Sequence, residues 1–235
     1  MLEAPSLKLG SWFSHGWTTF KEKPKQIIGG AVILSAFYWV LRLVGLVPGG
    51  FLLSLLGLLV VGPVLAVGWW FLCLKLLRGD SAKSLDIFGA FSRFGPAWVT
   101  FFLLSLIVFG GIILLIVPGI IWGLKYQLSL FAVMDEKLSA REAIRLSGKI
   151  TKGHMGKLFG MYVVAFLLDF LQWPLLIGLQ LLETDAGCII AAVGIVPYLV
   201  YILVIIPWLG ATLAAAYDSL VYEERKRWSE TDVSR

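Results

Sequence analysis

Charged side chains are scarce in this sequence, and their scarcity excludes a soluble globular protein. Asp, Glu, Lys and Arg make up 15% of the 235 residues, and hydrophobic residues make up 59%. An average soluble domain carries about 25% charged residues. Polar stretches long enough to form a separate soluble domain are also missing. We therefore expect a single membrane domain over residues 1–235.

Cysteine and histidine are also scarce. Their scarcity excludes most metal sites and most sites of nucleophilic catalysis. The chain has only Cys73, Cys188, His15 and His154. We expect the two cysteines near opposite membrane faces, too far apart for a disulfide, and the four residues show no metal-ligand spacing. Motifs of zinc proteases, serine hydrolases and phosphate-binding loops are absent too. The sequence predicts no catalytic residue, no metal site and no cofactor, and thus no enzyme.

Lys and Arg are missing from every second connection between the apolar runs. The connections near 48–50, 117–119 and 183–187 contain none, whereas basic residues collect in the N-terminal segment, in 75–93, in 137–157 and after 224. Basic residues mark cytoplasmic loops in membrane proteins, so both termini are predicted to be cytoplasmic. The net charge of +5 follows from this bias and does not indicate nucleic-acid binding.

Long apolar runs are what the sequence has in abundance. Residues 98–134 carry a single charge, and one helix of that length would measure about 55 Å against a hydrocarbon core of about 30 Å. The run must therefore reverse, and Pro118-Gly119 is the predicted turn because Pro and Gly interrupt helices. The fold class is predicted as all-α, with six transmembrane helices at about 27–47, 51–74, 98–116, 118–134, 158–182 and 188–217.

Three short amphipathic segments precede pairs of spans, at 6–23, 84–94 and 139–152. The first is predicted either to lie among lipid headgroups or to pack on the protein itself. The other two are predicted as interfacial helices on the cytoplasmic side. Each segment starts near a serine that can cap a helix, namely Ser6, Ser84 or Ser139. This order predicts a three-fold pseudo-repeat, with convergent topology as the alternative because the three units share few side chains.

The segment 139–152 combines a capping signal with a basic face. Ser139 and Glu142 have the spacing of a capping box, and Gly153 provides a stop. A basic residue beside an anionic membrane surface contributes about 1 kcal/mol. We predict headgroup contact, preferably with anionic lipid; the alternative is that the charges only set topology. The predicted contact residues are Lys137, Arg141, Arg145, Lys149, Lys152 and Lys157.

A few polar side chains interrupt the spans. Lys125 is expected near the middle of the fourth span, where a charge costs about 2.5–3.5 kcal/mol and normally has a partner. Asp169 in the fifth span is the predicted partner, with Tyr126, Gln127 and Gln172 completing an intramembrane polar site. This site is either a substrate or proton site, a structural ion pair, or a neutral lysine bonded to a carbonyl. Arg42 is expected to extend to the headgroups rather than to bind a ligand, which is the alternative.

One stretch also resembles a known group of proteins. The resemblance covers roughly residues 70–162 and rests on Pro118-Gly119-Ile120-Ile121, Asp135-Glu136, Ala143, Ser147 and Thr151-Lys152-Gly153-His154. These motifs are similar to uncharacterised bacterial six-span membrane proteins, relatives of the membrane domain fused to some glycerophosphodiester phosphodiesterases. The resemblance implies the six-span architecture and a bacterial inner (plasma) membrane. It implies no catalytic residue.

Two functions remain open at this level. The leading hypothesis is a non-catalytic scaffold or accessory protein that engages membrane lipids or partner proteins through its basic cytoplasmic helices, as a monomer or a homo-oligomer. The alternative is a small transporter or channel that uses Lys125 and Asp169.

Overall fold

Six helices long and apolar enough to cross a membrane run through the computed structural model, which describes residues 7–233. They are Pro24–Gly45, Gly50–Leu77, Ser84–Leu114, Ile116–Asp135, Met155–Gln180 and Asp185–Glu230. The described residues contain no strand. The predicted all-α, six-span membrane fold is therefore confirmed.

Local interruptions divide these spans into shorter elements. In chain order the elements are α1 (Leu9–Glu22), α2 (Pro24–Gly45), α3 (Gly50–Leu56), η1 (Gly57–Val61), α4 (Gly62–Leu77), η2 (Ser84–Arg93), α5 (Phe94–Leu114), α6 (Ile116–Tyr126), α7 (Ser129–Asp135), α8 (Ala140–Ile150), α9 (Met155–Asp169), η3 (Phe170–Gln172), α10 (Trp173–Gln180), α11 (Asp185–Val200), η4 (Tyr201–Ile205) and α12 (Ile206–Val233). The segments η1 and η4 are π-helical, and η2 and η3 are 3₁₀-helical.

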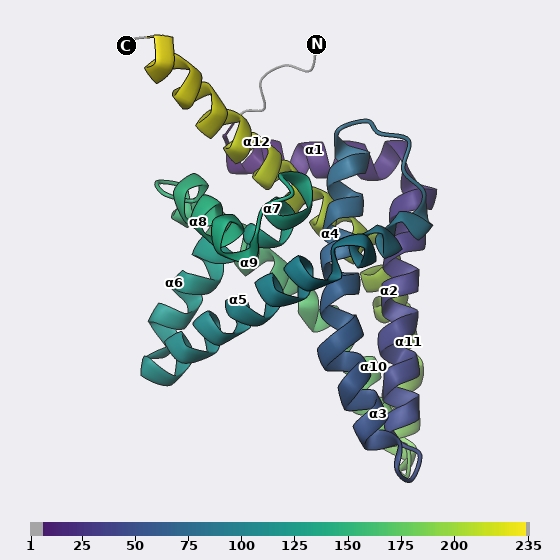
Figure 1. Cartoon of the computed structure of the whole chain (residues 1–235). Coiled ribbons are helices and arrows are strands. Elements are labelled where there is room, and N and C mark those ends of the chain that lie inside the picture. The colour runs from purple at the N-terminus through teal and green to yellow at the C-terminus, as the bar shows by residue number, and fades with distance from the viewer. Residues whose placement is uncertain (1–6, 234–235) are drawn as a thin grey trace.

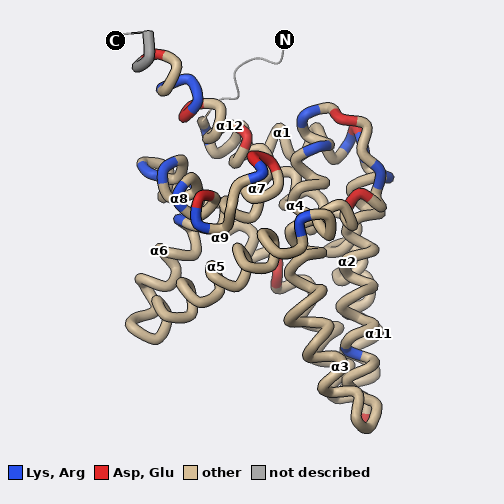
Figure 2. The backbone as a smooth tube through the Cα atoms, in the orientation of Figure 1, with Lys and Arg blue, Asp and Glu red and all other residues tan. Residues whose placement is uncertain are grey.

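The spans form hairpins that diverge from a common end. Figure 1 shows α1, α7, α8 and the last turns of α12 gathered at one end, with the α5–α6 hairpin spreading away from α2, α3 and α4. Lys and Arg concentrate at this same end (Figure 2), which we call the charged end. The three connections at the opposite end, residues 46–49, 115 and 181–184, contain no Lys or Arg. The uneven distribution of Lys and Arg along the sequence thus places them at one end of the folded protein.

The core lies where α4, α7 and α12 meet near the charged end. Trp69, Phe131 and Tyr217 are almost fully buried there, and the rings of Phe131 and Tyr217 stack with centroids 5.0 Å apart. The small residues Ala211, Ala214, Ala215 and Ala216 line α12. Small side chains let helix backbones approach closely in membranes, so α12 can lie at the centre of the fold.

Helix α1 packs on α12 rather than standing free. Trp12 is 1% exposed and donates a hydrogen bond from its indole N–H to the Ser219 hydroxyl, 2.8 Å away. A Cβ on Gly16 would lie 2.4 Å from the Thr212 hydroxyl, so only glycine permits this contact. Of the two expectations for the segment 6–23, packing on the protein is therefore the one seen for residues 9–22. Ser6 lies outside the described residues.

The predicted reversal at Pro118-Gly119 is displaced by three residues. Helix α5 ends at Leu114, the single residue Leu115 is extended, and α6 already begins at Ile116. Pro118 lies in the first turn of α6, where a backbone N–H has no helical partner and its absence costs nothing. Pro-Gly therefore marks the start of a helix here, and Gly111 against Gly119 allows the two arms to touch.

Wide helical turns precede two of the prolines within the spans. The Gly62 N–H bonds the carbonyl of Gly57 just before Pro63, and the Ile206 N–H bonds the carbonyl of Tyr201 just before Pro207. These i to i+5 bonds define η1 and η4 and accommodate the missing proline N–H. The predicted distortion at Gly62-Pro63 takes the form of this π-turn.

The segment predicted as an interfacial helix at 84–94 is a 3₁₀-helix joined directly to α5. A 3₁₀-helix has three residues per turn, so Leu85, Phe88, Phe91 and Phe94 form one exposed row while Ile87 and Ala90 are buried. Close docking requires glycine on α4, since a Cβ on Gly68 would lie 1.9 Å from the Ile87 carbonyl oxygen.

The order of short helix, span and span occurs three times in the chain. Ser139 does cap α8, but Ser84 does not cap η2, because the N-cap is Lys83 and the Ser84 hydroxyl donates to the carbonyl of Gln26. The three short helices also differ in type and in packing. Their equivalence as a pseudo-repeat stays a prediction.

Candidate functional site

An arginine joins the ends of three spans at the charged end. Arg78 follows α4 and donates from Nε to the Asp218 carboxylate, at 2.7 Å, and from both terminal nitrogens to the Asp135 carboxylate. The Tyr217 hydroxyl donates to Asp135 at 3.1 Å. Burial lowers the pKa of Arg78, but hydrogen bonds and charges from Asp135 and Asp218 outweigh burial and raise it. This satisfied network is a structural clamp.

Helix α8 is built as the sequence predicts at both of its ends. The Glu142 carboxylate accepts hydrogen bonds from the Ser139 N–H, at 3.0 Å, and from its hydroxyl, at 2.6 Å. These bonds hold the pKa of Glu142 below its ordinary value. Gly153 has a φ of 86°, the left-handed conformation of a helix stop.

The inner stripe of α8 is buried by the protein's own helices. Ala143, Ser147 and Ile150 are at most 3% exposed. The Ser147 hydroxyl donates to the carbonyl oxygen of Lys125 at 2.8 Å. The Thr151 hydroxyl lies 3.2 Å from the same oxygen and 2.8 Å from the Ser147 carbonyl oxygen. The Lys125 carbonyl is available because the fourth span breaks into α6 and α7 at residues 127–128. The break therefore fixes α8 to the bundle, and the apolar stripe is not free to enter lipid.

Lys125 and Asp169 do not form the predicted ion pair in the part of the chain that the structure describes. Lys125 lies beside α8, with its Cε 3.5 Å from where a Cβ of Gly148 would be, and its ammonium is 5.2 Å from the Tyr126 ring centroid. The Gln127 amide donates to the carbonyl of Leu124. The helix break brings Lys125 to α8, so Lys125, Tyr126 and Gln127 do not join an Asp169 site.

Asp169 instead has partners on its own span and on the sixth. The Gln172 amide donates to its carboxylate at 2.6 Å, and the Tyr201 hydroxyl donates to the same oxygen at 2.7 Å. Of the predicted intramembrane cluster, the structure thus brings together Asp169 and Gln172. Tyr201 is a partner that the sequence analysis missed, because nothing local in the sequence links residues 169 and 201.

The predicted headgroup residues remain on the outer side of α8 and its flanks. Lys137, Arg141, Arg145, Lys149 and Lys152 are exposed, and Lys157 is half-buried. Within residues 7–230 none of these six forms an ion pair with a carboxylate. The row of positive charge is therefore not neutralised by pairing within the protein.

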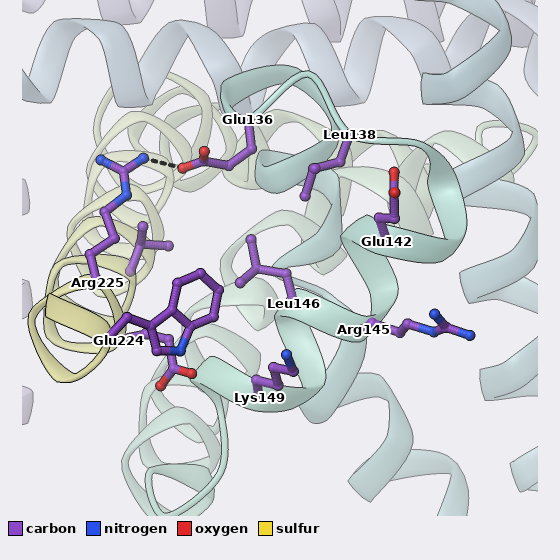
Figure 3. A pocket seen from close by; sticks show the side chains of 10 residues that line it. Glu136, Leu138, Glu142, Arg145, Leu146, Lys149, Glu224 and Arg225 are labelled. Carbon is purple, nitrogen blue, oxygen red and sulfur yellow. Dashed lines mark hydrogen bonds and ion pairs between the residues drawn. The ribbon is translucent and has the colours of Figure 1, made fainter. Parts of the chain in front are cut away.

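A pocket of about 300 Å³ lies between α8 and the last part of α12. Figure 3 shows Leu138 and Leu146 directed into the space between these helices, with Glu136 paired to Arg225 at its edge. The Lys149 ammonium is 5.5 Å from the Trp228 ring centroid. We call this the charged-end pocket; its lining residues are Glu136, Leu138, Glu142, Arg145, Leu146, Lys149, Val221, Glu224, Arg225 and Trp228.

A second cavity, of about 370 Å³, lies between α2 and the η3–α10 and α11–η4 segments. We call it the intramembrane cavity; its lining residues are Ser35, Tyr38, Trp39, Arg42, Gln172, Leu176, Tyr198, Tyr201, Ile202 and Ile206. Most of these polar residues were missed from sequence because they come from three segments far apart in the chain. The only signal was an arginine and several aromatics in otherwise apolar spans. No group of His, Cys, Asp and Glu in the described part of the chain could hold a metal ion.

Comparisons with known proteins add no name to these two sites. A scan against protein-family models finds no match, and searches of curated proteins and of solved structures give none either. The resemblance to six-span relatives of glycerophosphodiester phosphodiesterase membrane domains therefore stays a prediction. From its six apolar helices, the chain is a helical membrane protein with one charged end.

Proposed function

We propose that the protein is a non-catalytic bacterial inner-membrane protein that binds anionic lipid headgroups through α8 at its charged end, with both termini in the cytoplasm. The observation that carries the proposal is the way α8 is held. Its inner stripe is buried, and its Ser147 hydroxyl donates to the Lys125 carbonyl. Its basic face, from Arg141 to Lys152, is left exposed.

The attraction of this face to an anionic membrane is substantial. Each basic residue near such a surface contributes about 1 kcal/mol, so Arg141, Arg145, Lys149 and Lys152 together provide up to about 4 kcal/mol. A rigid helix loses little further entropy when a headgroup binds, which favours binding by a fixed site. A segment that only set the topology of the chain would need the basic residues, but it would not need to be attached to the Lys125 carbonyl.

The charged-end pocket supports a lipid over a wholly soluble anion. Leu138, Leu146 and Val221 line it together with three basic residues, Arg145, Lys149 and Arg225, and three acidic ones, Glu136, Glu142 and Glu224, so apolar and charged groups lie side by side. A lipid presents the same combination at the junction of headgroup and acyl chain. The volume of about 300 Å³ is at the lower end for small-molecule sites, and so suits a headgroup rather than a whole lipid.

Lipid retention by charge variants tests the proposal. We call the variant R141Q/R145Q/K149Q/K152Q the α8 variant. It and wild type are purified from mixed phosphatidylglycerol and phosphatidylcholine, and the lipids that stay bound are counted by native mass spectrometry. We expect the α8 variant to lose most of its preference for phosphatidylglycerol, and added salt to have the same effect on wild type because it screens exposed charges.

The matched control removes four positive charges elsewhere on the exposed surface. K8Q/K21Q/K25Q/K83Q has the same net charge as the α8 variant, and all four positions are exposed. An equal loss of phosphatidylglycerol in both variants would contradict a site on α8. Retention of lipid by the α8 variant, with loss of a co-purifying protein, would favour a protein partner instead.

Reporter fusions test the proposed orientation separately. A fusion after Arg227 should report a cytoplasmic location, and one within residues 183–187 a periplasmic location. The reverse result would place α8 on the outer side and remove the basis for contact with the anionic inner leaflet.

A further inference from the structure

The intramembrane cavity contains a cation that the protein does not neutralise. Arg42 lines the cavity, and in the part of the chain that the structure describes no carboxylate forms an ion pair with it. Its guanidinium lies 5.8 Å from the Trp39 ring centroid. Arg42 is exposed and lies near the end of its span, where a long basic side chain can reach the membrane surface. Its guanidinium is therefore accessible to an anionic group from outside the chain.

Asp169 does not fill this role. Its carboxylate accepts from the Gln172 amide and from the Tyr201 hydroxyl, and these two residues, not Asp169, line the cavity. The acid thus fixes the orientation of two lining side chains. Among the residues that line the cavity, Arg42 carries the charge.

Tyr198 offers the cavity a hydrogen-bond donor, whereas the Gln172 amide and the Tyr201 hydroxyl already donate to Asp169. The Trp39 indole N–H donates to the Tyr198 oxygen, which leaves the Tyr198 hydroxyl proton available for a further acceptor. Ser35, Tyr38 and Arg42 are spaced to lie along one face of α2. Hydroxyl donors and a guanidinium fork suit an anion with several oxygens.

The position of Arg42 suits a group at the membrane surface. It lies three residues before the end of α2 at Gly45, or about 4.5 Å along the axis at 1.5 Å per residue. Leu176, Ile202 and Ile206 make part of the cavity lining apolar. An amphiphile can place its anionic group on Arg42 and its apolar part against these residues.

We infer that the intramembrane cavity binds a phosphate ester anion on Arg42, at the end of the bundle opposite the charged end. The guanidinium pairs with the phosphate oxygens, and the Tyr198 hydroxyl donates to one of them. The apolar part of the cavity favours a phospholipid as the source of this phosphate over a soluble phosphoester. The site is separate from α8 and does not depend on the function proposed for it.

Substitutions in the cavity and on α8 separate the two sites. Wild type, Arg42→Met, Arg42→Lys, Tyr198→Phe and the α8 variant are compared for phosphatidylglycerol that survives delipidation, by native mass spectrometry. Arg42→Met should reduce this tightly held lipid at least five-fold, and Tyr198→Phe two- to five-fold. Arg42→Lys should fall between Arg42→Met and wild type, because it keeps the charge but loses the fork. Leu43→Met, on the exposed side of the same helix, is the matched control.

The source of the phosphate is decided by competition with glycerol 3-phosphate and inorganic phosphate. Displacement of the lipid only by another phospholipid assigns the site to lipid. Displacement by glycerol 3-phosphate that depends on Arg42 assigns it to a soluble phosphoester and still supports a phosphate site. Equal retention by wild type and a folded Arg42→Met overturns the inference, as does equal loss from Leu43→Met. A loss confined to the α8 variant overturns it too.

Discussion

Arg78 and Arg42 are two arginines near the ends of spans, and they differ in what surrounds them. Arg78 bonds two carboxylates, and Asp135 in turn accepts from Tyr217. Arg42 forms no ion pair with a carboxylate within residues 7–230, and its guanidinium lies over the Trp39 ring. A paired arginine stabilises the fold, whereas one left unpaired next to a cavity is available to a ligand. The comparison teaches that the carboxylates around an arginine, rather than its position near the end of a span, distinguish a structural arginine from one that can bind a ligand.

The largest expected effect comes from Arg78→Met. This change leaves Asp135, whose side chain is 8% exposed, without its cation. Breaking a buried pair in this way costs about 3–5 kcal/mol, so thermal unfolding in detergent should shift strongly downward. Asp135→Asn in the same chain should recover part of the loss.

The control for Arg78 is Arg225→Met. Arg225 pairs with Glu136, but its side chain is 59% exposed, and exposed pairs contribute about 0–1 kcal/mol. If both substitutions destabilise the protein equally, the distinction between a clamp and a surface pair is wrong.

A smaller loss is expected when the attachment of α8 is removed. Ser147→Ala with Thr151→Val removes both hydroxyls that lie within hydrogen-bond distance of the Lys125 carbonyl oxygen. An unsatisfied buried acceptor costs about 1–3 kcal/mol, and proteolysis at the α8 ends should accelerate in proportion. Ser105→Ala is the comparison, because its hydroxyl bonds only the Phe101 carbonyl within α5. Equal protease resistance in the double variant and wild type would show that the two hydroxyls do not hold α8.

For Arg42→Met we expect almost no change in stability in lipid-free detergent. No carboxylate in the described residues loses a partner, so the unfolding free energy should stay within about 0.5 kcal/mol of wild type. Added phosphatidylglycerol should stabilise wild type more than the variant, because a ligand stabilises the state that binds it. A loss as large as that of Arg78→Met would mean that Arg42 is a structural residue.

The stability of the protein is expected to depend on pH through His154, which lies between α8 and α9. Burial, and then the charges of Lys157 and Arg227, lower the pKa of His154 from its ordinary value of 6.5, with Glu223 opposing them. A group with a depressed pKa in the folded state stabilises the fold above its unfolded pKa and loses that contribution as pH falls. Thermal stability should therefore decrease below pH 6.5.

His154→Gln should remove this part of the pH dependence. The measurement is the difference in unfolding temperature between pH 7.5 and 5.5 for wild type and variant. Glu142, whose pKa lies below its ordinary value of 4.5, does not titrate in this window. An unchanged difference in the variant would assign the pH dependence to another group.

Sequence reasoning succeeded where the signal is local. Ser139, Glu142 and Gly153 define α8 because capping and the left-handed stop act within a few residues. It failed at Pro118-Gly119, because the same residues suit a turn and the first turn of a helix, and the start of α6 at Ile116 decides between them. It failed again at Lys125, because the break at residues 127–128 could not be read from an unbroken apolar run.

The sequence by itself determined the six spans and the concentration of charge at one end, since hydrocarbon thickness and loop charge depend only on the order of residues along the chain. Only the tertiary structure decided which polar groups meet. Asp169 bonds Tyr201 rather than Lys125, Arg78 takes both Asp135 and Asp218, and Arg42 is left beside a cavity. The physical reason is that a hydrogen bond forms over about 3 Å, and helix packing, bends and breaks set distances on that scale.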